Sequence, residues 1–145
     1  MTNPPVVLRS DGSKDYGAMA QAGAGWTLRM DLDDLTFVRV NHQTRLQFDQ
    51  TEVVIGCAFV VHADGVDHEL DPERRGELGP LLAVYPNTLS SASVENDGTL
   101  RLGFTSGARI VVPPHPMYEA WHVSGPGTRL IVCVPGNSGE LAVWT

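Results

Sequence analysis

The 145-residue sequence lacks most of the patterns that mark an enzyme or a membrane protein. It contains no glycine-rich phosphate loop, no Cys-x-x-Cys pair and no His-Glu-x-x-His motif. Its longest apolar runs, Val53–Val61 and Leu130–Val134, are too short to cross a bilayer as helices. The N-terminal residues show no basic start followed by an apolar core, so no secretory signal is predicted and a cytoplasmic location is expected.

Basic residues are scarce as well. Ten lysines and arginines stand against 17 aspartates and glutamates, which gives a net charge of −7, and Lys14 is the single lysine. The basic patch that phosphate binding requires is therefore missing, so we expect no direct contact with nucleic acid. An acidic surface can instead steer and pair with a basic protein partner, although solubility alone would explain the same charge.

The sequence has only two cysteines, Cys57 and Cys133, and each lies inside an apolar run. Free cysteine is among the residue types most often buried. In a cytoplasmic protein we expect two reduced thiols rather than a disulfide. Catalysis by either thiol with His115 or His122 is disfavoured, because a reactive cysteine needs an exposed, electropositive setting.

A period of two dominates the sequence from Trp26 onward and predicts about nine short β-strands. Asp64-Gly65 and Asn96–Gly98 lie between alternating apolar residues and predict tight hairpins. Glu52–Val61 is interpreted as one nearly buried strand with a bulge at Gly56. The predicted fold class is mainly β, or α+β with one short helix, arranged as an antiparallel roll, an open barrel or a sandwich.

One helix is predicted in the middle of the chain. Asp71 is an N-cap candidate and Pro72 fits the first helical position, while the better helical turns fall at Glu77–Val84. Residues 1–25 are rich in small and loop-forming residues and are predicted to be weakly structured. A single β-rich domain is therefore expected over residues 26–145.

Two groups of acidic residues are candidates for contact with a protein partner. The first lies just before the strand expected at residues 35–40, and the second lies between residues 64 and 73. The candidate partner-binding residues are Asp31, Asp33, Asp34, Asp67, Glu69 and Glu73. Calcium loops need a longer, spaced set of oxygen ligands with a glycine turn, so a solvated loop is the alternative for the first group.

A second candidate site follows a proline-rich stretch. His115, Tyr118, Glu119 and Trp121 are expected at the mouth of a ligand pocket, since strand alternation would place Glu119 and Trp121 on one face. Glu119 would be the acid of that pocket. The alternative is a structural role in which Glu119 accepts hydrogen bonds from the backbone or pairs with an arginine.

The best metal candidate is a pair of histidines. His62 and His68 flank the Asp64-Gly65 turn, with Asp67 and Glu69 beside them. A zinc site needs three or four ligands in tetrahedral geometry, and hairpin histidines are more often simple surface residues. We therefore expect no metal, no other cofactor and no catalytic residue.

The last three quarters of the chain resemble an uncharacterised family of small bacterial proteins. The most specific matching blocks are Tyr118-Glu119-Ala120-Trp121 and the terminal Leu141-Ala142-Val143-Trp144. Weaker matches are Asp71-Pro72, Pro80-Leu81-Leu82, Asp97-Gly98-Thr99-Leu100, Phe104, Ile110–Pro114 and Pro135-Gly136. The resemblance implies no established activity. Some small proteins of this kind are encoded beside secreted toxins, which implies an immunity role.

We therefore expect a non-enzymatic protein that binds another protein. In its most specific form it is an immunity protein whose acidic side chains dock on the basic substrate-binding cleft of a toxin. A second hypothesis is a small-molecule-binding β-roll with its pocket around Glu119 and Trp121. A third is a homodimer formed through an uncovered edge strand.

Overall fold

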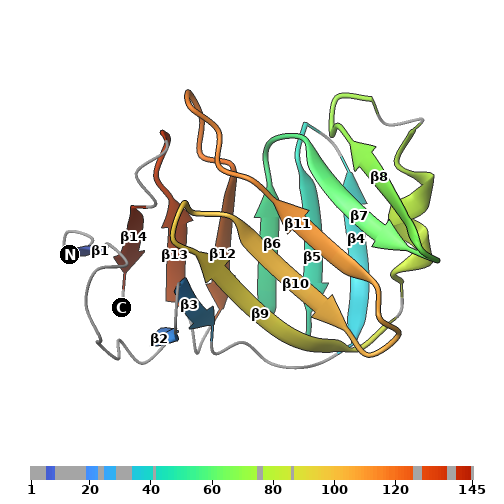
Figure 1. Cartoon of the computed structure of the whole chain (residues 1–145), viewed down its shortest axis with the longest axis horizontal. Coiled ribbons are helices and arrows are strands. Elements are labelled where there is room, and N and C mark those ends of the chain that lie inside the picture. The colour runs from blue at the N-terminus through green and yellow to red at the C-terminus, as the bar shows by residue number, and fades with distance from the viewer. Residues whose placement is uncertain are drawn as a thin grey trace.

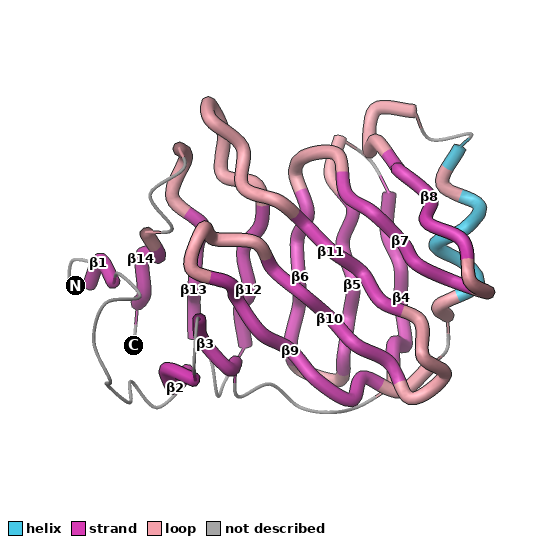
Figure 2. Tube along the Cα trace, in the orientation of Figure 1, coloured by secondary structure: helices cyan, strands magenta, loops and turns pink. Residues whose placement is uncertain are grey.

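The structure is a computed structural model that describes residues 6–8, 19–22, 25–28, 34–40, 42–74, 77–85, 87–125, 129–136 and 140–144. In this part of the chain, fourteen strands form two antiparallel sheets of seven strands each. The sheets lie face to face with the core between them (Figure 1). Strands account for nearly all of the regular structure, and helix is confined to one end (Figure 2).

The first sheet has the strand order β1-β14-β13-β12-β6-β5-β4. Its strands are β1 (Val6–Leu8), β4 (Leu35–Val40), β5 (Thr44–Phe48), β6 (Thr51–Ile55), β12 (Trp121–Gly125), β13 (Arg129–Cys133) and β14 (Leu141–Trp144). The second sheet has the order β2-β3-β9-β10-β11-β7-β8. Its strands are β2 (Met19–Ala22), β3 (Gly25–Leu28), β7 (Phe59–Ala63), β8 (Val66–Leu70), β9 (Leu89–Glu95), β10 (Leu100–Phe104) and β11 (Arg109–Val112).

Alternating apolar side chains build the core. In β5 and β7 the first, third and fifth residues are buried and the two between them are half-buried. Phe48 of the first sheet meets Phe104 of the second, with ring centroids 6.1 Å apart. Each fully buried side chain of this size contributes about 1.5–3 kcal/mol relative to an exposed one. The core therefore joins the two sheets into one packed unit.

The predicted mainly β class and both predicted hairpins are confirmed, and of the three predicted arrangements the structure has the sandwich. Asp64 and Gly65 connect β7 to β8 and have φ values of 54° and 76°. A two-residue hairpin turn of this type requires positive φ at both of its central residues. Gly98 has φ 97° at the turn between β9 and β10. Neither sheet closes on itself among the described strands, so the fold is sandwich-like rather than a barrel.

The prediction of one strand over Glu52–Val61 is wrong. The segment forms β6 in the first sheet and β7 in the second, and the chain crosses between the sheets at residues 56–58. The Gly56 N–H donates to the Ala120 carbonyl at 2.9 Å. A Cβ atom at Gly56 would lie 3.2 Å from the Glu119 carbonyl oxygen, so the close approach favours glycine there. Gly56 thus marks a crossover and not a bulge.

The predicted helix over Glu77–Val84 is shorter and of a different type. A 3₁₀ helix, η2, spans Gly79–Ala83, with Pro80 in its first turn. The Leu81 N–H donates to the Leu78 carbonyl at 3.0 Å, which is the spacing of a 3₁₀ helix. Asp71 caps a separate turn instead, where its Oδ1 accepts the Glu73 N–H at 3.0 Å. The Gly-Pro pair explains the difference, because both residues disfavour an α-helical interior.

Two short strands lie in the segment predicted to be weakly structured. β1 pairs with β14 through Val6 and Val143, and β2 pairs with β3 through Met19 and Leu28. Both strands occupy sheet edges. The other residues before Gly25 lie outside the described part of the chain.

Candidate functional site

One end of the sandwich gathers most of the exposed acids among the residues that the structure describes. This end lies at the right of Figure 1 and contains β8, the turn before β8, η2 and the edge strand β4. We call this region the acidic end and define it by residues 34–38, 64–74 and 77–85. η2 packs on β7, so a short helix closes this end of the core.

The acidic side chains of this end point into solvent. Six of them are exposed, namely Asp34, Asp64, Asp67, Glu69, Glu73 and Glu77. His62 Nδ1 lies 2.5 Å from Asp67 Oδ1, and Arg74 lies 3.9 Å from Glu77. One hollow of about 350 Å³ is lined by Glu69, Asp71, Arg74 and Glu77 together with Ala58 and Leu70. The second predicted acidic group is therefore brought together on one surface.

The first predicted acidic group is represented by Asp34. Its side chain is exposed and accepts a hydrogen bond from the Thr88 hydroxyl. Asn87, next to Thr88, lines a hollow together with Asp64, so Asp34 lies at the same end as the second group. Asp31 and Asp33 lie outside the described residues.

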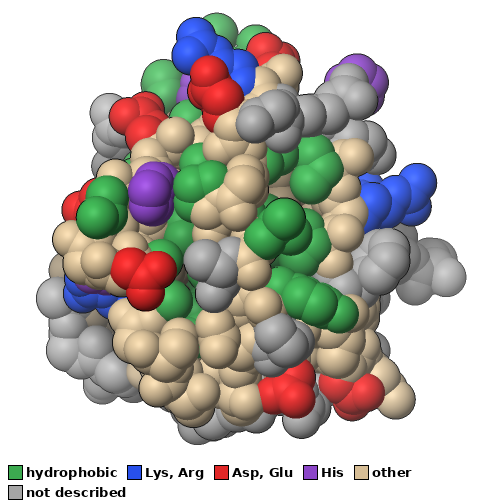
Figure 3. Space-filling view, turned by 90° about the vertical axis from the view of Figure 1, so that its right-hand side faces the viewer, with side chains coloured by type: hydrophobic (Ala, Val, Ile, Leu, Met, Phe, Trp, Pro, Cys, Tyr) green, Lys and Arg blue, Asp and Glu red, His purple; other side chains and the backbone are tan. Residues whose placement is uncertain are grey.

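An apolar patch lies in the middle of the acidic end. Leu82 is 66% exposed and Tyr85 is 45% exposed. With Thr36 and Val38 of β4 they line a hollow of about 220 Å³. The Tyr85 hydroxyl donates to the Thr36 carbonyl at 3.3 Å, which fixes the ring against the edge strand. Figure 3 faces this end and shows hydrophobic side chains gathered in the middle, with acidic side chains around them.

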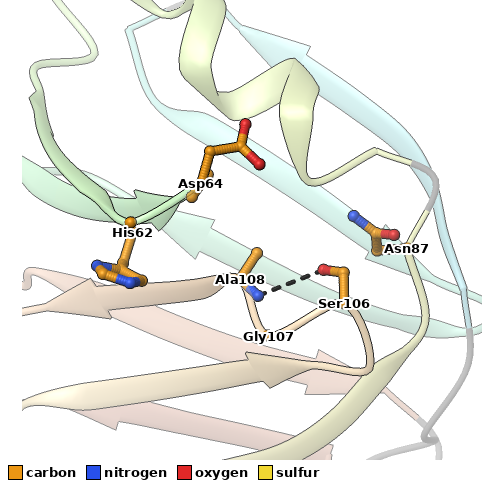
Figure 4. A pocket seen from close by; sticks show the side chains of 8 residues that line it. His62, Asp64, Asn87, Ser106, Gly107 and Ala108 are labelled. Carbon is orange, nitrogen blue, oxygen red and sulfur yellow. Dashed lines mark hydrogen bonds between the residues drawn. The ribbon is translucent and has the colours of Figure 1, made fainter.

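A polar hollow of about 430 Å³ lies beside this patch (Figure 4). Two turns form its walls, Asp64-Gly65 and Ser106-Gly107, and Asn87 lies across from Asp64. The Ser106 hydroxyl accepts the Ala108 N–H at 3.3 Å. The His62 ring points away from the Asp64 carboxylate in this view, in keeping with its contact to Asp67.

The four predicted pocket residues differ in burial. Trp121 is fully buried in the core, and its Nε1–H donates to the Gly98 carbonyl at 2.9 Å. Tyr118 and Glu119 are exposed and His115 is half-buried, all on the loop between β11 and β12. The expected alternation is wrong, because Ala120 and Trp121 are both buried. Glu119 and Trp121 therefore lie in different environments.

The two histidines considered for a metal are held apart by the hairpin register. His62 pairs with Asp67 and His68 pairs with Val61, so the two imidazoles lie on opposite faces of the sheet. They cannot bind one ion together. Within the described residues, no three histidine, cysteine, aspartate or glutamate side chains are grouped as metal ligands. No described helix has the length and apolar character needed to span a membrane.

Both cysteines are free, as predicted, but only Cys133 is buried. Burial raises the pKa of the Cys133 thiol to about 11, with smaller contributions from Cys57, Asp97 and Glu119. Burial, and then the charge of Asp71, also raises the pKa of Cys57. Neither thiol is therefore set up as a thiolate nucleophile at neutral pH.

The model of one protein family matches most of the chain. This family, DUF6188, is a family of unknown function, and its model matches residues 26–145. The chain belongs to DUF6188. No curated protein and no solved structure matches the chain.

The DUF6188 match begins at Trp26, within β3, and includes both the acidic end and the loop between β11 and β12. The resemblance to an uncharacterised family is thus confirmed, with a start slightly earlier than expected. Sequence reasoning missed the exposure of Leu82 and Tyr85. In a 3₁₀ helix, side chains three positions apart lie on the same side. Apolar residues at Leu78, Leu81 and Val84 follow that spacing and are buried, so the spacing would have predicted that Leu82 and Tyr85 lie on the exposed side.

Proposed function

We propose that this protein binds a basic protein partner through the acidic end. The observation that supports the proposal is the exposed pair Leu82 and Tyr85 at an end of the molecule that also exposes six carboxylates. Interfaces combine a few apolar or aromatic anchors with a polar rim, and tyrosine is enriched among the anchors. In its most specific form the protein is an immunity protein that covers the basic cleft of a toxin.

Charge supports a basic partner in particular. Residues 64–77 contain six acids and two arginines, within a chain of net charge −7. Most of these carboxylates face water, so they attract a cationic surface during diffusional encounter. Affinity at such a rim falls as salt rises, because the Debye length shortens from about 10 Å at 0.1 M to about 3 Å at 1 M.

The chemistry of the described groups favours binding over catalysis. Cys133 has a pKa of about 11, so almost all of it is protonated at neutral pH. His62 lies on the outer face of the sheet, where its Nδ1 is already engaged by the Asp67 carboxylate. We therefore propose a non-enzymatic protein.

The test uses the purified chain and the product of the neighbouring gene, measured by surface plasmon resonance at about 50 mM and about 300 mM salt. Glu69→Gln with Glu73→Gln removes two charges from the rim. Asp97→Asn with Glu95→Gln removes the same number at the turn between β9 and β10 and is the control. We expect the rim pair to slow association by about three- to tenfold at low salt, and the control pair to have little effect.

Two results would contradict the proposal. Absence of binding by the wild-type chain at low salt removes its basis. Equal effects of the rim pair and the control pair would show that net charge, and not the acidic end, attracts the partner.

A further inference from the structure

The loop between β11 and β12 exposes a second apolar surface, far from the acidic end in sequence. We call residues 113–120 the proline loop, because positions 113, 114 and 116 are prolines. It extends beyond the ends of the strands at the top of Figure 1. Met117 is 73% exposed and Tyr118 is 65% exposed, which makes Met117 the most exposed of the large hydrophobic side chains described.

His115 holds this loop in one shape. Its Nδ1 accepts the backbone N–H groups of Met117 at 3.0 Å and of Tyr118 at 3.2 Å. The His115 and Tyr118 rings are in contact, with centroids 4.8 Å apart. The Gly136 N–H donates to the His115 carbonyl at 3.0 Å, so the turn is also tied to the neighbouring loop. Met117 and Tyr118 are thus presented on a backbone that is already ordered.

Folding does not account for the exposed Met117 side chain, whereas the Tyr118 ring also contacts His115. Ala120 and Trp121, at the foot of the loop, are fully buried and join it to the core. The shape of the turn rests on His115 and backbone groups and not on the Met117 side chain. Methionine and tyrosine are enriched at protein interfaces, and a pre-ordered loop loses less conformational entropy on binding.

We propose that the proline loop inserts Met117 and Tyr118 into an apolar cleft of the protein partner. The loop is convex, so the surface that receives it is concave. Glu119 follows with an exposed carboxylate, and complementarity places a cationic group at the rim of that cleft. This inference rests on the proposed function, since the partner is the same basic protein that contacts the acidic end.

The experiment compares two matched double variants with the product of the neighbouring gene. Met117→Ser with Tyr118→Ser changes the loop, and Leu82→Ser with Tyr85→Ser changes the acidic end. Each removes one aliphatic side chain and one tyrosine at exposed positions. We expect the loop variant to weaken binding by about 30-fold or more, as loss of central anchors does, and to leave the urea unfolding midpoint unchanged.

A second measurement tests the inference without the loop variant, in case that variant folds poorly. In the wild-type chain, the ¹³C-labelled methyl group of Met117 is expected to shift when the partner is added, because the cleft excludes water from it. An unchanged Met117 methyl signal in the bound state overturns the inference. Affinity that stays within about threefold in the loop variant also overturns it, while the acidic end remains supported. Failure of the wild-type chain to bind removes both proposals.

Discussion

The acidic end and the proline loop each expose one long aliphatic side chain and one tyrosine, but they are built differently. At the acidic end, Tyr85 is fixed by the carbonyl of Thr36, which lies 49 positions earlier in the chain. In the proline loop, His115 holds backbone groups two and three positions later. The first surface therefore exists only when the whole sandwich is formed, whereas the second is shaped mainly by its own residues.

The difference also appears in charge. Six exposed carboxylates share the acidic end with Leu82 and Tyr85, while the proline loop carries Glu119 alone. Long-range attraction is therefore expected from the acidic end, and short-range apolar contact from the loop. If both contact one partner, the acidic end should govern the association rate and the loop the dissociation rate.

Truncating a core side chain beneath either region is expected to change the free energy of unfolding more than any of the other proposed substitutions. Trp121→Ala, at the foot of the loop, removes the largest fully buried side chain described and should lower the free energy of unfolding by about 3–5 kcal/mol. Leu81→Ala, beneath the acidic end, should lower it by about 2–5 kcal/mol. Urea denaturation measures both values. A change below about 1 kcal/mol for Trp121→Ala would contradict its place in the core.

The two thiols differ in how far they are enclosed. Burial is the main cause of the raised pKa of both, with Asp71 adding to that of Cys57, and Cys57, Asp97 and Glu119 adding to that of Cys133. At pH 8 a thiol with a pKa of about 11 is only about one part in a thousand thiolate. We expect Ellman's reagent to modify half-buried Cys57 first and Cys133 only on unfolding.

Single-cysteine variants, Cys57→Ser and Cys133→Ser, assign the two rates of modification. Trp121→Ala should speed the modification of Cys133, because Trp121 and Cys133 both donate to the Gly98 carbonyl. If Ellman's reagent modified both thiols of the native protein at the same rate, Cys133 would not be buried as it is in the structure.

A smaller effect depends on pH and involves His122, which follows Trp121 on β12 but faces outward. It lies between Val54 and Val132 of the neighbouring strands. Burial, and then the charge of Arg45, lowers the pKa of His122 below its ordinary value of 6.5, while Glu119 and Glu52 act in the opposite direction. As pH falls through 6.5, the unfolded chain takes up a proton that the folded chain does not.

Stability from His122 is thus present above pH 6.5 and is lost as the pH falls toward the lowered value. His122→Gln should remove this part of the pH dependence, so wild type should lose more stability than the variant between pH 8 and pH 5. Urea denaturation at both pH values measures the difference. Parallel losses in the two proteins would show that His122 is solvated in the folded state.

The sequence by itself determined the β-rich class and the hairpins at Asp64-Gly65 and Asn96–Gly98. These follow from local chemistry, because a period of two selects strands and residues that tolerate positive φ select tight turns. It also determined the acid excess and the resemblance to a family of unknown function.

The tertiary structure alone decided which residues meet. Gly56 carries the chain from one sheet to the other because the Ala120 carbonyl, 64 positions later, accepts its N–H. Trp121 lies in the core and Tyr118 in solvent, although the two are neighbours in one aromatic block. Burial depends on pairing between distant strands, and no local pattern contains that information. For the same reason, only the fold could bring Asp34 and the acids after Gly65 to one end of the molecule.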